Sequence, residues 1–243
     1  MNPIRISFTP CQPNRLHSNL AQNNEFARKK VADFVNGLSL SQTIYIYGES
    51  GVGKTHLINQ MLSNFVDNKK GIKVLNAHCF VLSILNAIKN NSLESYRSSL
   101  KHYLFVIIED IDLFSFKQRS QTEFLEATEY VLSHEYLKVI VTSQSHFSKL
   151  LGINGKRLNW LRSFVVVKIA SPTADDKKLL IHTFILNHRI QISTKAIEYL
   201  CFQGADNYFL LLGTLNTLKL YYEHTNCPIT LRTPEFLSLI WRY

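Results

Sequence analysis

Short apolar runs and segments of helical periodicity alternate from residue 23 to residue 169. Apolar residues recur at helical spacing in four segments: 23–38, 54–67, 80–100 and 121–133. β-branched and aromatic residues are concentrated in five short runs: 43–48, 72–77, 103–110, 137–143 and 164–169. Strands that alternate with helices in this way predict an α/β fold, in which a parallel sheet carries helices on both faces.

The pattern changes after Pro172. Apolar residues then follow a helical period in four segments: 173–189, 193–203, 207–224 and 232–243. Thr173 or Ser171 can cap the first of these helices. We therefore expect two domains, an α/β domain at 1–170 that includes an extended N-terminal arm, and an all-helical domain at 171–243.

Composition adds the class of protein and an indication of its partner. No apolar run reaches the roughly 20 residues that a membrane helix needs, and the N-terminus lacks a secretory signal, which predicts a cytoplasmic protein without a membrane partner. Four scattered cysteines without a C-x-x-C pair predict free thiols. The net charge is +9, and the segment 136–174 contains no Asp or Glu. This favours an acidic partner such as nucleic acid, although a basic surface alone would give the same charge.

The segment 48–56, GESGVGKTH, contains a complete match to the phosphate-binding pattern G-x-x-x-x-G-K-[ST], between a predicted strand and a predicted helix. Its glycines let backbone N–H groups turn toward phosphates, and the helix N-terminus adds its positive end. Lys54 can reach the β- and γ-phosphates, and Thr55 can hold Mg²⁺. We expect the loop to bind a nucleotide through the residues Gly48, Gly51, Val52, Gly53, Lys54, Thr55 and His56.

An apolar strand ends in acids in the segment FVIIEDID, residues 105–112. Beside the loop, one carboxylate would hold Mg²⁺ and its neighbour would orient the attacking water. Glu109, with Thr55, is the expected metal ligand, and Glu109 and Asp110 are the expected catalytic carboxylates. The alternative is a strand that simply ends in solvated acids.

Two more segments carry polar groups that suit a nucleotide site. The strand in VIVTSQS ends in Thr142 and Ser143, whose hydroxyls can sense the γ-phosphate, although strands often end in hydroxyls. Arg162, in RLNWLRSF, is a candidate arginine finger that completes the site of a neighbouring subunit. A surface role is the alternative for this arginine.

The order of these segments resembles that of AAA+ ATPases, and in particular the family of the bacterial replication initiator DnaA and its shorter relative Hda. The resemblance extends from Asn23 to the C-terminus. It implies an AAA+ P-loop NTPase fold with a C-terminal all-α lid, and ATP or ADP with Mg²⁺ as ligands. NNEFARKKVADFV is similar to the family's adenine-pocket segment, which implies that Asn24 and Phe26 lie near the base.

The same resemblance implies a role in starting chromosome replication or restraining it. DnaA assembles on the origin, whereas Hda acts with the sliding clamp to promote hydrolysis of the ATP that DnaA holds. The chain stops at Tyr243, after the lid, where DnaA continues into a DNA-binding domain, and this favours the Hda-like role. Phe209 stands at the position of the sensor 2 arginine, which predicts at most weak ATPase activity. The segment 3–8, PIRISF, has the apolar end of a clamp-binding motif without its initial Gln.

Three functions follow from these features. A regulator would hold ATP or ADP and offer Arg162 or Arg157 to the ATP of DnaA. A truncated initiator or helicase loader would bind single-stranded DNA through 81–100, which carries Lys89 and Arg97 and resembles the single-strand-binding helices of DnaA. An autonomous ATPase is the third. We expect the first, with DnaA as its partner and with the sliding clamp, single-stranded DNA and further copies of the chain as candidate partners.

Overall fold

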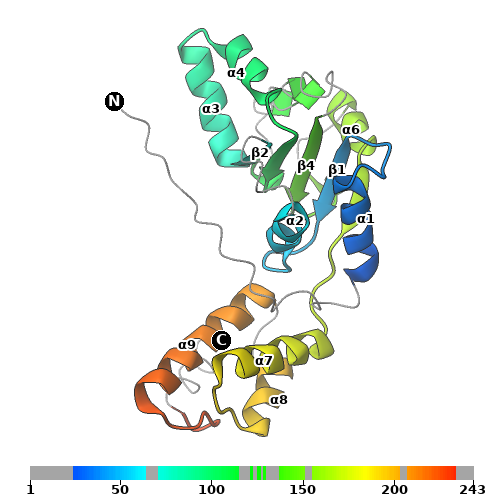
Figure 1. Cartoon of the computed structure of the whole chain (residues 1–243). Helices are drawn as coiled ribbons and strands as arrows, with labels where there is room; N and C mark the ends of the chain where they lie inside the picture. Colours follow the sequence, from blue (N-terminus) through cyan, green and yellow to red (C-terminus); the bar gives the residue numbers. More distant parts are fainter. Residues whose placement is uncertain are drawn as a thin grey trace. The chain divides into compact units, whose positions relative to one another are not determined.

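A parallel five-stranded sheet forms the centre of residues 24–171 in the computed structural model (Figure 1). Its strands, in spatial order, are β2 (Ile72–Asn76), β3 (Phe105–Glu109), β4 (Lys138–Ser143), β1 (Thr43–Tyr47) and β5 (Val165–Lys168). All four neighbouring pairs run parallel, so the carboxyl ends of the strands meet at one edge of the sheet. The sheet and its flanking helices confirm the predicted α/β fold.

Helices cover both faces of this sheet, because successive side chains of a strand point to opposite sides. Ile44 and Ile46 of β1 belong to a core shared with α1 (Glu25–Val35) and α2 (Lys54–Leu62). Tyr45 belongs to the core on the other face. The helices that contribute to that second core are α3 (Ala77–Lys89), α4 (Leu93–Leu100) and α6 (Gly155–Arg162).

The described residues of this unit also include two short 3₁₀ turns and a break between two helices. The turns are η4 (Ile111–Phe114), after β3, and η5 (Phe147–Lys149), after β4. The helical segment predicted at 80–100 is two helices, because Asn91 adopts a φ of 52°, in the left-handed region where a right-handed helix cannot continue.

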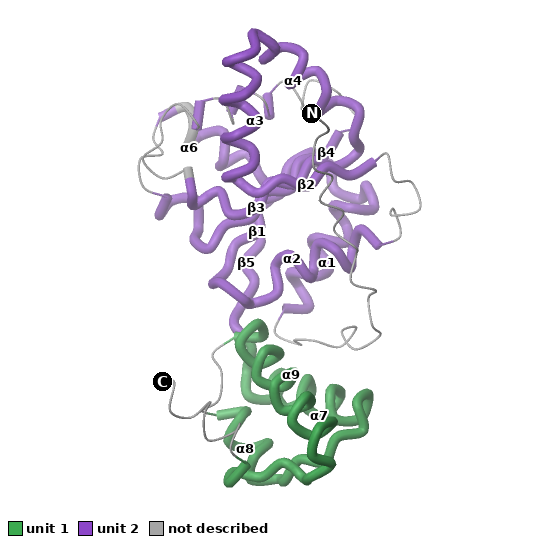
Figure 2. Tube along the Cα trace, turned by 90° about the vertical axis from the view of Figure 1, so that its left-hand side faces the viewer, with its two compact units in different colours: residues 1–23, 172–243 green, residues 24–171 purple. Residues whose placement is uncertain are grey.

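Residues 172–202 and 207–233 form a second compact unit with its own core (Figure 2). Its helices are α7 (Ala174–His188), α8 (Thr194–Phe202) and α9 (Tyr208–Thr225). A capping box begins α7: the Thr173 hydroxyl accepts a hydrogen bond from the N–H of Asp176, and the Asp176 carboxylate accepts one from the N–H of Thr173. Asn207 caps α9 in a similar way, by accepting from the N–H of Leu210.

The structure describes residues 24–63, 71–114, 121–122, 125–126, 128–129, 137–150, 155–202 and 207–233. The segment 3–8, which has the apolar end of a clamp-binding motif, lies outside the described residues, as does most of the helix expected at 232–243. Within the described ranges, no helix has both the length and the apolar character that a membrane span requires.

Candidate functional site

The loop that joins β1 to α2 has the backbone geometry of a phosphate-binding loop. Gly51 and Gly53 adopt φ angles of 75° and 99°, in the left-handed region that glycine enters without steric cost. Gly53 is the N-cap of α2, so the first N–H groups of this helix open toward the loop. The N-terminus of a helix that follows a glycine-rich loop is suited to bind an anion.

Gly48 stands at the start of this loop, where the ends of three strands meet. Its N–H donates to the carbonyl oxygen of Ser143, at the end of β4, over 3.2 Å. A Cβ atom on Gly48 would lie 2.4 Å from the carbonyl oxygen of Ile169, which follows β5. Only a residue without a side chain fits between these two backbones.

Gly48→Ala is therefore expected to lower the free energy of unfolding by about 1–3 kcal/mol, since the new methyl group must displace the backbone. Chemical denaturation measures this change. Gly213→Ala in α9 is the matched control, because an added Cβ there meets nothing within 4 Å. Alanine is favoured over glycine in a helix interior by about 1 kcal/mol, so the control should be at least as stable as the native chain. An equally stable Gly48→Ala variant would contradict the close approach.

Lys54 begins α2 and is turned into the loop. Its side chain is buried, and Nζ donates to the carbonyl oxygens of Gly48 (2.6 Å) and Glu49 (2.9 Å). Burial lowers the pKa of Lys54, and the carboxylates of Asp110, Asp112 and Glu109 oppose that shift. A partly desolvated ammonium beside open N–H groups suits a strongly anionic ligand, which compensates for the hydration that the cation has lost.

Thr55 and Glu109, the expected metal ligands, are in contact. The Thr55 hydroxyl donates to Glu109 Oε1 over 2.7 Å, although the two residues are far apart in sequence. The described residues contain no cluster of three or more His, Cys, Asp or Glu side chains with metal-ligand geometry. One hydroxyl and one carboxylate fit Mg²⁺, which usually takes its remaining ligands from phosphates and water.

Asp110 and the end of β4 are also joined. Asp110 is exposed and adopts a φ of 57°, an uncommon conformation for a residue with a side chain. Its N–H donates to the hydroxyl of Thr142 over 3.1 Å, and Thr142 is buried. The turn that presents Asp110 is thus held by one of the two hydroxyl residues predicted as phosphate sensors.

Asp112 was missed in the sequence. Its carboxylate accepts hydrogen bonds from the Ser143 hydroxyl (2.8 Å) and from the N–H of Gln144 (2.7 Å). The second predicted sensor, Ser143, therefore points at Asp112. The available signal was a further acid two residues after Asp110, directly past the end of an apolar strand.

The remaining predicted residues lie at different places. Asn24 is buried, and its side-chain amide makes two hydrogen bonds with the backbone of Ala170, at 3.1 and 2.8 Å. Phe26 is 74% exposed, and the Lys30 ammonium lies 5.4 Å from the centre of its ring. Val52 is buried within the loop, and His56 is exposed on α2.

Arg162 is exposed in the last turn of α6, where its guanidinium donates to Asn159 Oδ1 over 3.2 Å. The side chain of Arg157, the other finger candidate, lies outside the described residues. The structure thus brings together Lys54, Thr55, Glu109, Asp110 and Thr142 around the phosphate-binding loop, and it presents Arg162 to solvent.

Residues 18–167 match the family model described as the bacterial DnaA ATPase domain. The chromosomal replication initiator protein DnaA of Buchnera aphidicola subsp. Baizongia pistaciae is 25% identical over 202 residues, which are 81% of this chain and 44% of that protein. DnaA of Buchnera aphidicola subsp. Cinara cedri is 25% identical over 203 residues, 82% of this chain and 46% of that protein. The chain therefore spans less than half the length of these curated relatives.

Solved structures resemble the chain as well. Domain III of DnaA from Thermotoga maritima has a TM-score of 0.80 at 20% identity, over 92% of this chain and 93% of that one. A replication initiator DnaA bound to AMPPCP and single-stranded DNA has a TM-score of 0.74 at 21% identity, over 85% and 66%. The Holliday junction branch migration motor RuvB of Thermotoga maritima has a TM-score of 0.60 at 13% identity, over 92% and 70%. At these identities the likeness shows the fold, which is the predicted AAA+ P-loop fold.

Proposed function

Since this chain belongs to the family of bacterial DnaA ATPase domains, we propose that it binds ATP or ADP with Mg²⁺ and regulates the start of chromosome replication by acting on DnaA. The observation that carries the nucleotide part is the contact between Thr55 and Glu109 beside the buried Lys54. These groups follow β1 and end β3, two strands on either side of β4, at the carboxyl edge where open α/β sheets bind their ligands.

The choice of an adenine nucleotide rests on the family. A related DnaA has been solved in complex with AMPPCP, an ATP analogue. In this chain Lys54 would bind the β- and γ-phosphates, and Thr55 and Glu109 would hold Mg²⁺. The bound ion would neutralise charge on the phosphates. Asn24 and Phe26 remain the residues proposed for the base.

The regulatory part rests on the accessibility of Arg162. Its guanidinium is exposed on the surface of α6, and an arginine supplied in trans can complete the nucleotide site of a partner. The chain would hydrolyse its own ATP slowly, because Phe209 stands where the family resemblance implies a sensor 2 arginine. Phe209 is 75% exposed in the first turn of α9 and supplies no charge. In this proposal 171–243 acts as the lid, and the protein works in the cytoplasm.

The proposal is tested with the unmodified protein. It should be isolated with ATP or ADP bound, and it should accelerate the hydrolysis of ATP held by DnaA, in a reaction that also contains the sliding clamp. Released nucleotide is identified by chromatography, and hydrolysis is followed as phosphate release from preloaded DnaA. A chain without measurable affinity for either nucleotide contradicts the first part, and a bound chain without effect on DnaA contradicts the second.

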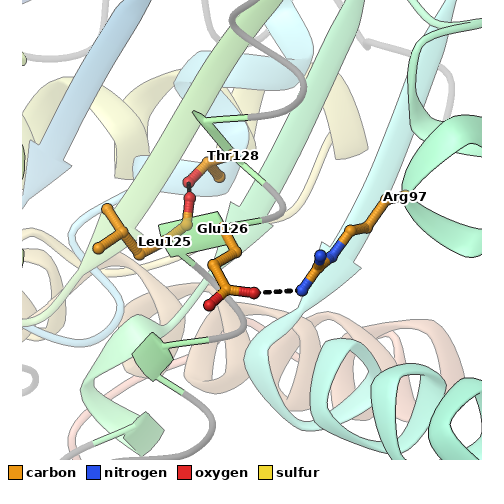
Figure 3. Close-up of polar contacts among 4 residues, drawn as sticks. All are labelled: Arg97, Leu125, Glu126 and Thr128. Carbon is orange, nitrogen blue, oxygen red and sulfur yellow. Dashed lines mark hydrogen bonds and ion pairs between the residues drawn. The ribbon is translucent and has the colours of Figure 1, made fainter. Parts of the chain in front are cut away.

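A second candidate function is the binding of single-stranded DNA, as in an initiator or a helicase loader. Leu82 and Leu85 on α3 are about half exposed and are followed by the exposed Lys89, so apolar side chains that can contact bases lie on the same helix as a cation that can contact a phosphate. Arg97 of α4 is already engaged: its guanidinium bonds the carboxylate of Glu126 (Figure 3). A phosphate would have to compete with that carboxylate, which weakens this candidate.

The DNA candidate predicts binding that falls steeply with salt. When the logarithm of the binding constant is plotted against the logarithm of the salt concentration between 50 and 200 mM, each phosphate contact on a single strand contributes about −0.7 to the slope. Fluorescence anisotropy with labelled oligo(dT) measures it. Tight binding at physiological salt, reduced by Lys89→Ala, would favour an initiator or loader over a regulator. Weak binding that disappears at 200 mM salt is the result we expect.

A further inference from the structure

Asp112 makes contacts that neither phosphate binding nor metal binding requires. It lies in η4, two residues after Asp110, and its carboxylate accepts two hydrogen bonds from the end of β4. The donors are the hydroxyl of Ser143, which is fully buried, and the N–H of Gln144. By accepting from both donors, this one side chain restrains the last residue of β4 and the residue that follows it.

The restrained strand end is connected in turn to the phosphate-binding loop. The carbonyl oxygen of Ser143 accepts the hydrogen bond of the Gly48 N–H over 3.2 Å. One residue earlier, the Thr142 hydroxyl accepts the N–H of Asp110. A continuous series of hydrogen bonds thus runs from η4 through the end of β4 to the first residue of the loop.

We propose that Asp112 is a positioning residue that couples the end of β4 to the phosphate-binding loop, so that Thr142 and Gly48 are held in the arrangement that ATP requires. The effect of this coupling on ATP affinity rests on the proposed function. The coupling itself is a property of the chain and does not depend on a bound nucleotide. The close approach of Gly48 to the Ile169 backbone supports it, because a loop confined on that side can shift mainly on the side of Ser143.

Two substitutions separate position from charge. Asp112→Ala removes both acceptors. Asp112→Asn keeps both contacts: the amide oxygen accepts from Gln144, and the amide N–H₂ donates to the Ser143 hydroxyl. That hydroxyl then donates its own proton to the carbonyl oxygen of Ser145, which it already reaches over 2.8 Å. If positioning is the role, the asparagine variant should rescue what the alanine variant loses.

The first readout needs no nucleotide. In Asp112→Ala, amide hydrogen exchange at Gly48 should accelerate by about tenfold or more, while the amide of Ile107 in the centre of β3 keeps its native rate. Asp112→Asn should restore the native rate at Gly48. An unchanged Gly48 amide in the alanine variant overturns the proposal, as does equal acceleration at Gly48 and Ile107, which indicates general destabilisation.

The second readout is the affinity for nucleotide by equilibrium titration. Asp112→Ala should weaken ATP binding by about tenfold, the value of a hydrogen bond to a charged group, and Asp112→Asn should recover it. An equal loss of ATP affinity in Asp112→Ala and Asp112→Asn would show that the negative charge of Asp112, and not its hydrogen bonds, controls binding. That result would overturn the positioning role. If the native chain binds no nucleotide, the proposed function fails, and the exchange rate at Gly48 still decides the coupling. If Asp112→Ala does not fold, Ser143→Ala removes one of the two contacts and should give a smaller acceleration at Gly48.

Discussion

Lys54→Ala is expected to raise the dissociation constants for ATP and ADP on the order of 100-fold, because it removes charge-assisted hydrogen bonds worth about 1.5–3 kcal/mol each. The ammonium is buried inside the loop and already bonded to the carbonyl oxygens of Gly48 and Glu49. The ammonium is therefore already positioned in the loop when the nucleotide binds. No other side chain of the loop carries a positive charge in this position. Titration with a fluorescent ADP measures the change.

Lys195→Ala is the matched control for this experiment. Lys195 is exposed on α8, in the other compact unit, so its replacement removes the same charge from the chain and leaves every residue of the loop unchanged. It should bind nucleotide as the native chain does. Native affinity in Lys54→Ala would remove the main support for a nucleotide site. Equal weakening in both variants would mean that the total charge of the chain, and not the position of Lys54, controls binding.

Arg162→Ala is expected to abolish the acceleration of ATP hydrolysis on DnaA while leaving the nucleotide affinity of this chain unchanged. An arginine supplied to a partner's site is worth about 10³–10⁵ in rate in well-studied GTPases, so the loss should reach the unstimulated rate. Arg162 is exposed and in contact with Asn159 on its own helix, so its removal should not disturb the fold. Phosphate release from DnaA at saturating concentrations of the variant measures the effect.

Two controls locate the effect. Lys149→Ala removes another exposed cation from the segment 136–174, which contains no Asp or Glu. It should leave the stimulation of ATP hydrolysis intact, which would exclude a general effect of charge. Arg157→Ala should have little effect if Arg162 is the finger. Loss of stimulation in Arg157→Ala alone would make Arg157 the finger and the assignment of Arg162 wrong.

The layered fold was predictable because the apolar repeats of its strands and helices can each be recognised within one short segment. In the run TIYIY, every residue favours a strand, and the structure divides the run between two cores by alternation, with Ile44 and Ile46 on one face and Tyr45 on the other. The loop was predictable for a related reason. Its glycines, lysine and threonine are contiguous, and the left-handed φ angles at Gly51 and Gly53 are conformations that their residue type permits.

The partners of the polar side chains were not predictable to the same degree. Thr142 and Ser143 remain predicted phosphate sensors, and the structure adds their contacts with the turn after β3, through Asp110 and Asp112. These contacts join residues about 30 positions apart, so they depend on β4 lying next to β3. Nothing local in the segment around Asp112 indicates that neighbour.

The five strands, most of the described helices, the phosphate-binding loop and its two acids could be placed from the sequence, since each depends on residues within one short segment. Helix α6 was not predicted. Three other features depend on the folded chain: Thr55 contacts Glu109, Lys54 is buried in the loop, and Asp112 accepts hydrogen bonds from the end of β4. The physical reason is that such contacts require the order of strands in the sheet. That order follows from how all the apolar faces are buried together, and no single segment contains it.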